Sequence, residues 1–257
     1  MRVFFASAYY GYKGLFFWET PTIYLTQRLL LPLTGMAFFS LIGKFGGSQP
    51  LEFYLIGNAI LIASLSGFTI AAVITAERNL GTLIYLIGSP ANRVALFFGR
   101  AAVHVAESAV FVVVGFGWAI LVFGLDLPLS TWPGILLTIA VGTLAVSGLG
   151  LLLGAVAYVF LDSGVLGNIM IFVILLVSGA NIPLSELPPA LAFLGEALPL
   201  TRSIEAARAL AAGGEITASL PLLLKDLAVG LGYAFVGFFL FSWIEVMARR
   251  RGTLESM

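Results

Sequence analysis

Six long apolar runs limit what this chain can fold into. They cover residues 21–43, 53–76, 101–125, 132–161, 164–182 and 227–247. A helix needs about 20 mostly apolar residues to cross a bilayer. Because the bilayer holds no water to bond backbone groups, runs of this length are expected to be helices, whereas a membrane barrel would show alternating strands of about ten residues. We therefore predict an all-α, polytopic membrane protein in which residues 1–257 form a single transmembrane domain with six spans.

The composition supports this class. Hydrophobic residues make up 60% of the 257 residues and charged residues only 10%, which is more apolar than a water-soluble domain of this size. The 13 basic residues balance the 13 acidic ones, so nothing favours nucleic acid as a partner. The lack of cysteine excludes disulfides and cysteine metal sites.

Basic residues near the ends of the runs predict the orientation, because cytoplasmic loops of membrane proteins carry an excess of Lys and Arg. With the N-terminus inside, the inner segments hold more basic residues than the outer ones, and residues 249–251 contribute most. We therefore expect both termini and residues 77–93 in the cytoplasm. Arg28 lies inside the first run and is expected to snorkel to the inner headgroups.

The first 20 residues are predicted to form a helix that lies in the membrane interface. They are too polar to span and are rich in aromatic side chains, which favour the headgroup region. These are Phe4, Phe5, Tyr9, Tyr12, Phe16, Phe17 and Trp18. Such a helix serves either as a simple leader to the first span or as a gating element.

Residues 77–93 form a short polar break with a helical apolar stripe. Leu80, Leu83, Ile84 and Ile87 recur at helical spacing. Pro90 ends the pattern. The periodicity alone fits an ordinary amphipathic helix held against the membrane.

Polar side chains inside apolar runs are functional candidates, because they are costly at bilayer depth. His104 and Glu107 are one helical turn apart and can face the same way. They indicate either a hydrogen-bonded pair between packed helices or a proton relay in a secondary transporter, although the two halves of the chain show no repeat of the kind such carriers often have. Three others are candidates for helix contacts or for a substrate path: Asn58, Asn168 and Ser178.

Small residues in the fourth run predict close helix packing. Gly150 and Gly154 are four residues apart, a spacing that lets two helices approach. Gly142, Ser147 and Gly148 extend the same narrow face. We expect this face to hold neighbouring spans of one chain together.

Two segments resemble the type-2 ABC exporter permeases, the membrane subunits that export drugs, polysaccharides and lipid-linked glycans. The first is the order Glu77, Gly81-Thr82-Leu83, Leu86, Ser89-Pro90, Arg93, which is similar to the first cytoplasmic loop of that family. The second, residues 178–208, resembles the family's Ser-Gly span end, its Pro-Leu turn, and its Pro-Leu-Thr followed by Ile-Glu-Ala-x-Arg. Ile84 and Leu198 depart from the pattern, since many members carry an acidic residue and an Asn at these places.

The resemblance assigns roles to both segments. Residues 77–93 would be the coupling helix that fits a groove on an ATP-hydrolysing subunit, through Glu77, Arg78, Leu80, Gly81, Thr82, Leu83, Leu86, Ser89, Pro90 and Arg93. Residues 183–210 would be outer re-entrant helices that act as an exit gate, with Pro183, Leu184, Pro199, Leu200, Thr201 and Glu205.

The implied partners are two copies of an ABC ATPase and a second permease chain, identical or homologous, in the bacterial inner membrane. The resemblance also implies that the second and fifth spans line the seam of this dimer. The sequence has no Gly-x-x-x-x-Gly-Lys-Ser/Thr phosphate loop. ATP and Mg are therefore expected on the partner, and we expect no cofactor and no enzymatic activity in this chain.

Apolar runs with few ions favour a hydrophobic or amphipathic substrate such as a drug, a lipid or a secondary metabolite. A glycan or lipid-linked polysaccharide is the alternative within the same family. A proton-coupled secondary transporter, and a membrane-bound assembly subunit that transports nothing, remain the alternatives outside it.

Overall fold

The computed structural model describes residues 2–18, 20–47, 49–63, 70–71, 93–160 and 163–251. These residues form helices joined by turns, with no strand among them, which confirms the all-α prediction. The helices are α1 (Arg2–Trp18), α2 (Pro21–Gly46), α3 (Leu51–Leu61), α6 (Arg93–Leu121), α7 (Trp132–Phe160), α8 (Ser163–Val177), α9 (Pro189–Ala197), α10 (Thr201–Ala211) and α11 (Ile216–Arg251). Two short 3-10 turns, η1 (Leu129–Thr131) and η2 (Leu184–Glu186), precede α7 and α9.

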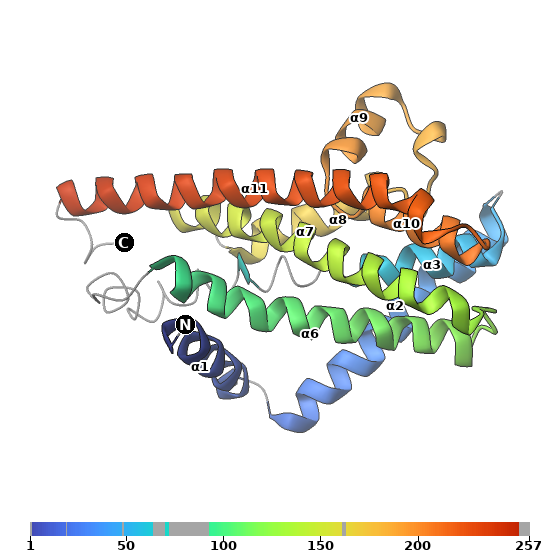
Figure 1. Ribbon diagram of the computed structural model, residues 1–257, viewed down its shortest axis with the longest axis horizontal. Coiled ribbons are helices and arrows are strands. Elements are labelled where there is room, and N and C mark those ends of the chain that lie inside the picture. Colours follow the sequence, from blue (N-terminus) through green and yellow to red (C-terminus); the bar gives the residue numbers. More distant parts are fainter. Residues whose placement is uncertain are drawn as a thin grey trace.

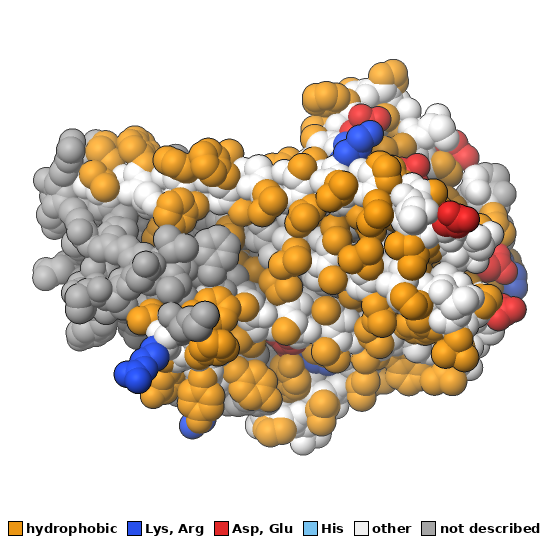
Figure 2. Space-filling view, in the orientation of Figure 1, with side chains coloured by type: hydrophobic (Ala, Val, Ile, Leu, Met, Phe, Trp, Pro, Cys, Tyr) orange, Lys and Arg blue, Asp and Glu red, His pale blue; other side chains and the backbone are white. Residues whose placement is uncertain are grey.

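The long helices lie along one axis of an elongated bundle. Figure 1 shows α6, α7 and α11 running along the length of the molecule, with α1 beside one end and α9 standing off the bundle near the other. Apolar side chains cover the flank of the bundle in the view of Figure 2, and acidic side chains gather at the end that carries the turns before α7 and α11. This distribution is the one expected of helices that cross a membrane.

Four helical stretches in the described residues are long and apolar enough to cross a membrane. They are Pro21–Gly46, Ala102–Leu121, Leu129–Ala157 and Ile216–Ile244. They correspond to the first, third, fourth and sixth predicted spans. Two predicted spans match shorter apolar helices, Leu51–Leu61 and Val165–Val177. Most of the second run after residue 63 lies outside the described residues, so the count of six spans stays a prediction.

Several predicted boundaries differ from the structure. The predicted third span covers 101–125, but α6 runs from Arg93 to Leu121. The predicted sixth span starts at residue 227, but α11 already starts at Ile216. Lys225 and Asp226, which interrupt the apolar pattern, lie within the helix rather than before it. The predicted fifth span extends to residue 182, whereas α8 ends at Val177, because Gly179 adopts a left-handed conformation (φ 80°) that turns the chain.

The N-terminal segment is helical, as predicted, and packs along the start of α6. A Cβ at Gly99 would lie 3.1 Å from the Cβ of Ser7, so the glycine allows the two helices to approach closely. The helix then ends, and α2 begins with Thr20 as its N-cap and Pro21 at its first turn. The Thr20 hydroxyl accepts from the backbone N–H of Ile23 (3.4 Å), and proline is favoured at that position because it needs no donor.

Glycines allow α7 and α11 to form the most extensive helix contact in the described residues. A Cβ at Gly230 would lie 2.6 Å from the carbonyl oxygen of Ala145, and one at Gly237 would lie 2.7 Å from the backbone nitrogen of Leu152. Gly148 meets the backbone of Gly230 in the same way. The predicted role of Gly148 in packing spans of one chain is thus confirmed, and backbone contact of this closeness excludes any side chain.

We predict that Gly230→Ala destabilises the protein, because the added methyl group overlaps the Ala145 backbone and overpacking of this kind costs about 1–3 kcal/mol. Thermal unfolding of the detergent-solubilised chain, followed by the loss of its monodisperse gel-filtration peak, measures the effect. Gly232→Ala is the matched control, since a Cβ at Gly232 meets nothing within 4 Å. Equal melting temperatures for the two variants would contradict the packing argument.

Candidate functional site

The predicted outer gate, residues 183–210, lies between α8 and α11 in the sequence and contains η2, α9 and most of α10. The chain passes from Gly179 through η2 and α9 and then reverses at Leu200, the only described non-glycine residue with positive φ (81°). A bulky side chain is strained in this conformation, so the conformation persists only where the surroundings hold it there. Leu200 is also the residue before the first turn of α10, so the reversal and the helix start coincide.

Asp226 of α11 holds this reversal in place. Its carboxylate accepts hydrogen bonds from the backbone N–H of Leu200 (3.1 and 3.2 Å to its two oxygens), and from the backbone N–H of Ser203 (3.3 Å) and the Ser203 hydroxyl. Asp226 is completely buried. A carboxylate that binds the free N–H groups of a helix start is also stabilised by the positive end of the helix dipole. The start of α10 is therefore capped by a neighbouring helix rather than by its own sequence.

Further contacts join the same turn to α9 and α11. The Thr201 hydroxyl donates to the carbonyl of Gly195 (2.6 Å) at the end of α9, and the Tyr233 hydroxyl of α11 donates to the carbonyl of Ala197 (3.0 Å). Pro199 and Thr201 are buried. Three predicted gate residues, Pro199, Leu200 and Thr201, are thus brought together at one buried reversal.

Arg208, in the last turn of α10, ties this helix to α3 and to the end of α8. Its Nη1 donates to the carbonyl of Gly179 (2.8 Å), and its Nη2 donates to the carbonyls of Ala180 (2.8 Å) and Phe53 (2.9 Å). Its Nε also donates to Phe53 (3.2 Å). The guanidinium lies 3.4 Å from the centre of the Phe53 ring, a cation–π arrangement.

No carboxylate lies within ion-pair distance of Arg208 in the described part of the chain. Burial lowers the pKa of Arg208 to about 9, partly offset by Glu205 and Tyr54. The group is therefore a cation at neutral pH. A positive charge held by neutral carbonyls and an aromatic ring is fixed in direction without being neutralised.

Two predicted path residues lie beside this contact and one does not. The Asn58 amide of α3 donates to the side-chain oxygen of Asn181 (2.9 Å) and to the carbonyl of Tyr54. Ser178 is completely buried, and its hydroxyl accepts from the N–H of Ala180 (3.4 Å). Asn168 is instead exposed on α8, away from both.

The remaining predicted gate residues form the rim of the segment. Pro183 precedes η2, and the side chain of Leu184 packs where Gly179 and Gly195 leave no room for a Cβ. Glu205 is exposed on α10 and makes no ion pair in the described residues.

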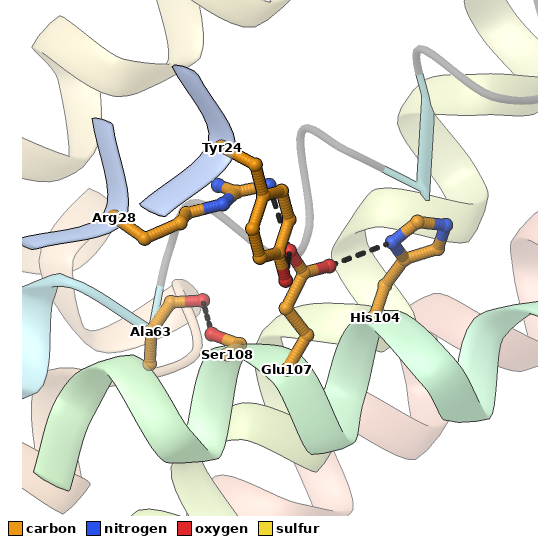
Figure 3. A network of polar contacts seen from close by, with 6 residues as sticks. All are labelled: Tyr24, Arg28, Ala63, His104, Glu107 and Ser108. Atoms are coloured by element: carbon orange, nitrogen blue, oxygen red, sulfur yellow. Dashed lines mark hydrogen bonds and ion pairs between the residues drawn. The ribbon is translucent and has the colours of Figure 1, made fainter. Parts of the chain in front are cut away.

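A second polar centre joins α2 to α6 (Figure 3). Glu107 accepts from the Tyr24 hydroxyl (2.8 Å) and pairs with Arg28, whose Nη2 lies 2.8 Å from Oε1. The Nδ1 of His104 lies 3.3 Å from the other carboxylate oxygen. Arg28, which was expected to snorkel to the headgroups, has a partner in the Glu107 carboxylate inside the bundle, and its guanidinium lies 4.8 Å from the centre of the Phe111 ring.

The sequence interpretation missed Asp226 and the roles of Arg208 and Arg28. Asp226 stands directly before the last apolar run, and an acid at that depth is a functional candidate by default. Arg208 lay within the motif resemblance but carried no assigned role. Among the described residues, no group of three His, Asp or Glu side chains could hold a metal ion.

The predicted ATPase contacts fall almost entirely outside the residues that the structure describes. These are Glu77, Arg78, Leu80, Gly81, Thr82, Leu83, Leu86, Ser89 and Pro90. Arg93 is the first residue of α6. The coupling helix therefore stays a prediction from the resemblance.

Comparison with models of protein families gives a match. A family model described as ABC-2 type transporter matches residues 11–211. The match covers both segments on which the resemblance was based, 77–93 and 178–208. None of the curated proteins compared with the chain matches it.

We predict that Asp226→Ala lowers the thermal stability of the protein more than Asp226→Asn does. Alanine leaves the N–H groups of Leu200 and Ser203 unbonded in a buried place, at about 1–3 kcal/mol for each unsatisfied group, whereas asparagine keeps one acceptor oxygen. The melting temperature in detergent measures this order. Lys225→Ala, one residue away and exposed, serves as the control and should leave the melting temperature unchanged. If Lys225→Ala lowered the melting temperature as much as Asp226→Ala does, the cap would be refuted.

Proposed function

Because the chain belongs to the ABC-2 type transporter family, we propose that it is the transmembrane permease subunit of an ATP-driven exporter that moves a hydrophobic or amphipathic compound outward. The observation that carries the proposal is the family match over residues 11–211. The all-helical fold with membrane-crossing helices supports it.

The proposed complex contains two permease chains and two ATPase subunits, which bind the ATP and Mg. An exposed apolar face on α8 supports a second permease chain. Val165, Ile169, Phe172 and Leu176 recur there at helical spacing, and Phe172 is 70% exposed. This face lies on the fifth predicted span, 164–182, which is one of the two spans that the resemblance implies line the dimer seam.

The proposed mechanism works by linkage between two conformations rather than by chemistry in this chain. Closure of the ATPases on ATP would shift the coupling helices at residues 77–93, and the permease pair would change to a packing that opens outward. The path would run between the second and fifth spans, near Asn58 and Ser178, and would leave through the segment 183–210. The complex would sit in the bacterial inner membrane with both termini of this chain inside.

The surface supports an apolar substrate over a glycan. Many apolar side chains of α2, α8 and α11 are exposed in the single chain, including Phe38, Phe172 and Phe235. Ionic groups within the described bundle are already engaged, as in the Arg28–Glu107 pair. A glycan or lipid-linked polysaccharide is the second candidate, and the runner-up class is a proton-coupled carrier, which the His104–Glu107 contact motivates.

The first test is the coupling helix. We predict that Glu77→Arg leaves insertion of the protein intact but removes the stimulation of a co-purified ATPase by hydrophobic compounds, because a polar contact to the ATPase is reversed in charge. Glu215→Arg is the matched control, since it makes the same reversal at an exposed turn before α11. Stimulation by the Glu77 variant equal to that by the parent would count against the coupling assignment, and failure of any ATPase to co-purify would count against the exporter.

The second test separates ATP from a proton gradient. Glu107→Gln keeps an acceptor oxygen for Tyr24 and for the Arg28 guanidinium, and hydrogen-bonding capacity toward His104, but it cannot carry a proton through ionisation. We predict that ATP-driven export by this variant in vesicles stays within about twofold of the parent. Complete loss of export with a normal gel-filtration profile would favour the proton-coupled carrier instead.

A further inference from the structure

Helix α10 is held at its two ends by contacts of different kinds. At its start, the carboxylate of Asp226 is completely buried and engages three donors. Breaking that contact would leave a buried charge and a helix start without partners, both of which are strongly unfavourable. A turn of four residues, 212–215, also joins α10 directly to α11.

The same helix is fitted against α7. A Cβ at Gly142 would lie 3.1 Å from the Ser203 hydroxyl oxygen, and one at Gly134 would lie 2.9 Å from a methyl group of Leu210. Leu200, Ile204 and Leu210 are almost completely buried. These contacts fit α10 closely against α7, and the Asp226 cap joins its start to α11.

The polar contact at the other end of α10 is easier to release than the Asp226 cap, although Leu55, Ile56 and Ile60 of α3 also pack in one buried cluster with Ile204 of α10. Among the described residues, Arg208 donates only to neutral carbonyls, those of Phe53, Gly179 and Ala180, and its side chain is not fully buried. On separation, water can bond both the guanidinium and these carbonyls, so no unpaired buried charge remains. Phe53 belongs to α3, and the other two carbonyls belong to the turn that follows α8.

The contact of α10 with α3 and the turn after α8, here called the Arg208 seam, is also incompletely hydrogen-bonded. The amide nitrogen of Asn181 is buried and has no hydrogen-bond partner within the described part of the chain, although its oxygen accepts from Asn58. A buried donor without a hydrogen-bond partner is unfavourable and is uncommon in the interior of a folded protein. Opening of this seam would let water bond it.

From this asymmetry we infer that Arg208 is a positioning residue that acts as a clasp. It closes the outer end of the permease by holding α10 against α3 and the turn after α8. Opening separates the chain at this residue, while α10 stays on α7 and α11. The direction of opening rests on the proposed export function, but the presence of the clasp does not.

Ser178 provides a reporter directly behind the clasp. It is completely buried and adjoins Gly179, one of the acceptors of Arg208. The chain has no cysteine, so Ser178→Cys introduces a single thiol at little change in size. Its reaction with a membrane-impermeant maleimide, on the full-length chain in membranes, measures how often the seam opens.

Arg208→Gln should raise the labelling rate of this thiol at least tenfold, because glutamine cannot bond three carbonyls or stack as a cation on Phe53. Arg208→Lys keeps the charge and should restore slow labelling part of the way. Ala209→Gln, at an exposed position of the same helix, is the control and should label as slowly as the parent. An Arg208→Gln rate equal to that of the parent would overturn the clasp.

A readout that depends on the cycle separates a clasp from a mere fold contact. In the complex with its ATPase, trapping with ATP and vanadate should raise the labelling of the Arg208 parent severalfold. The Arg208→Gln variant should already label fast and respond little; a full nucleotide response in that variant would refute the clasp. If Arg208→Gln does not fold, Phe53→Leu decides, since it removes the ring under the guanidinium and should raise the rate at least twofold, and an unchanged rate would refute the clasp.

The two proposals fail separately. Labelling of the chain alone needs no ATPase, so fast labelling of Arg208→Gln without any ATPase that co-purifies would support the clasp and refute the exporter. Unchanged labelling in a chain that does bind and stimulate an ATPase would refute the clasp alone.

Discussion

The carboxylate of Asp226 is the contact on which the arrangement of α8 to α11 in this structure depends. A chain that turns back among apolar helices must bond the free N–H groups of each new helix start, because the surroundings offer no water. Asp226 does this for α10 from a different helix. The capped start fixes the direction of α10, which in turn carries Arg208 to the carbonyls of α3 and of the turn after α8. One buried acid thus determines where three other elements meet.

Charged groups specify helix pairs here, and small residues bring helices together. The α7–α11 contact is made by glycines, whose backbones approach directly. Packing of this kind is strong but could be met by other small faces. The Arg28–Glu107 pair and the Asp226 cap admit far fewer alternatives, since each leaves a buried charge if it is broken. The two centres lie on different helix pairs, α2 with α6 and α10 with α11.

The local elements could be predicted from the sequence where chain chemistry sets them. Pro21 starts α2 at the predicted residue, and Trp132 starts α7 likewise. Boundaries failed where a tertiary contact overrides local pattern. The apolar pattern places Asp226 at the end of a polar gap, yet it lies inside α11. Its backbone partners, the N–H groups of Ser203 and Leu200, are 23 and 26 residues away in the sequence. Periodicity contains no information about such partners, and the residues that would show how 77–93 folds lie outside those described.

Four charged residues of the bundle show what a sequence can reveal about a membrane interior. Glu107 was recognised as buried and costly, and an opposite charge, Arg28, stood in another apolar run, so this pair could have been matched by charge. Asp226 and Arg208 could not, because most of their partners are backbone groups, which do not depend on the residue type, and neither has a charged partner among the described residues. An ionisable residue in an apolar run therefore predicts that a partner exists, but identifies it only when that partner is itself a charged side chain. The helix reversal and the clasp follow from the other case, which only the folded chain displays.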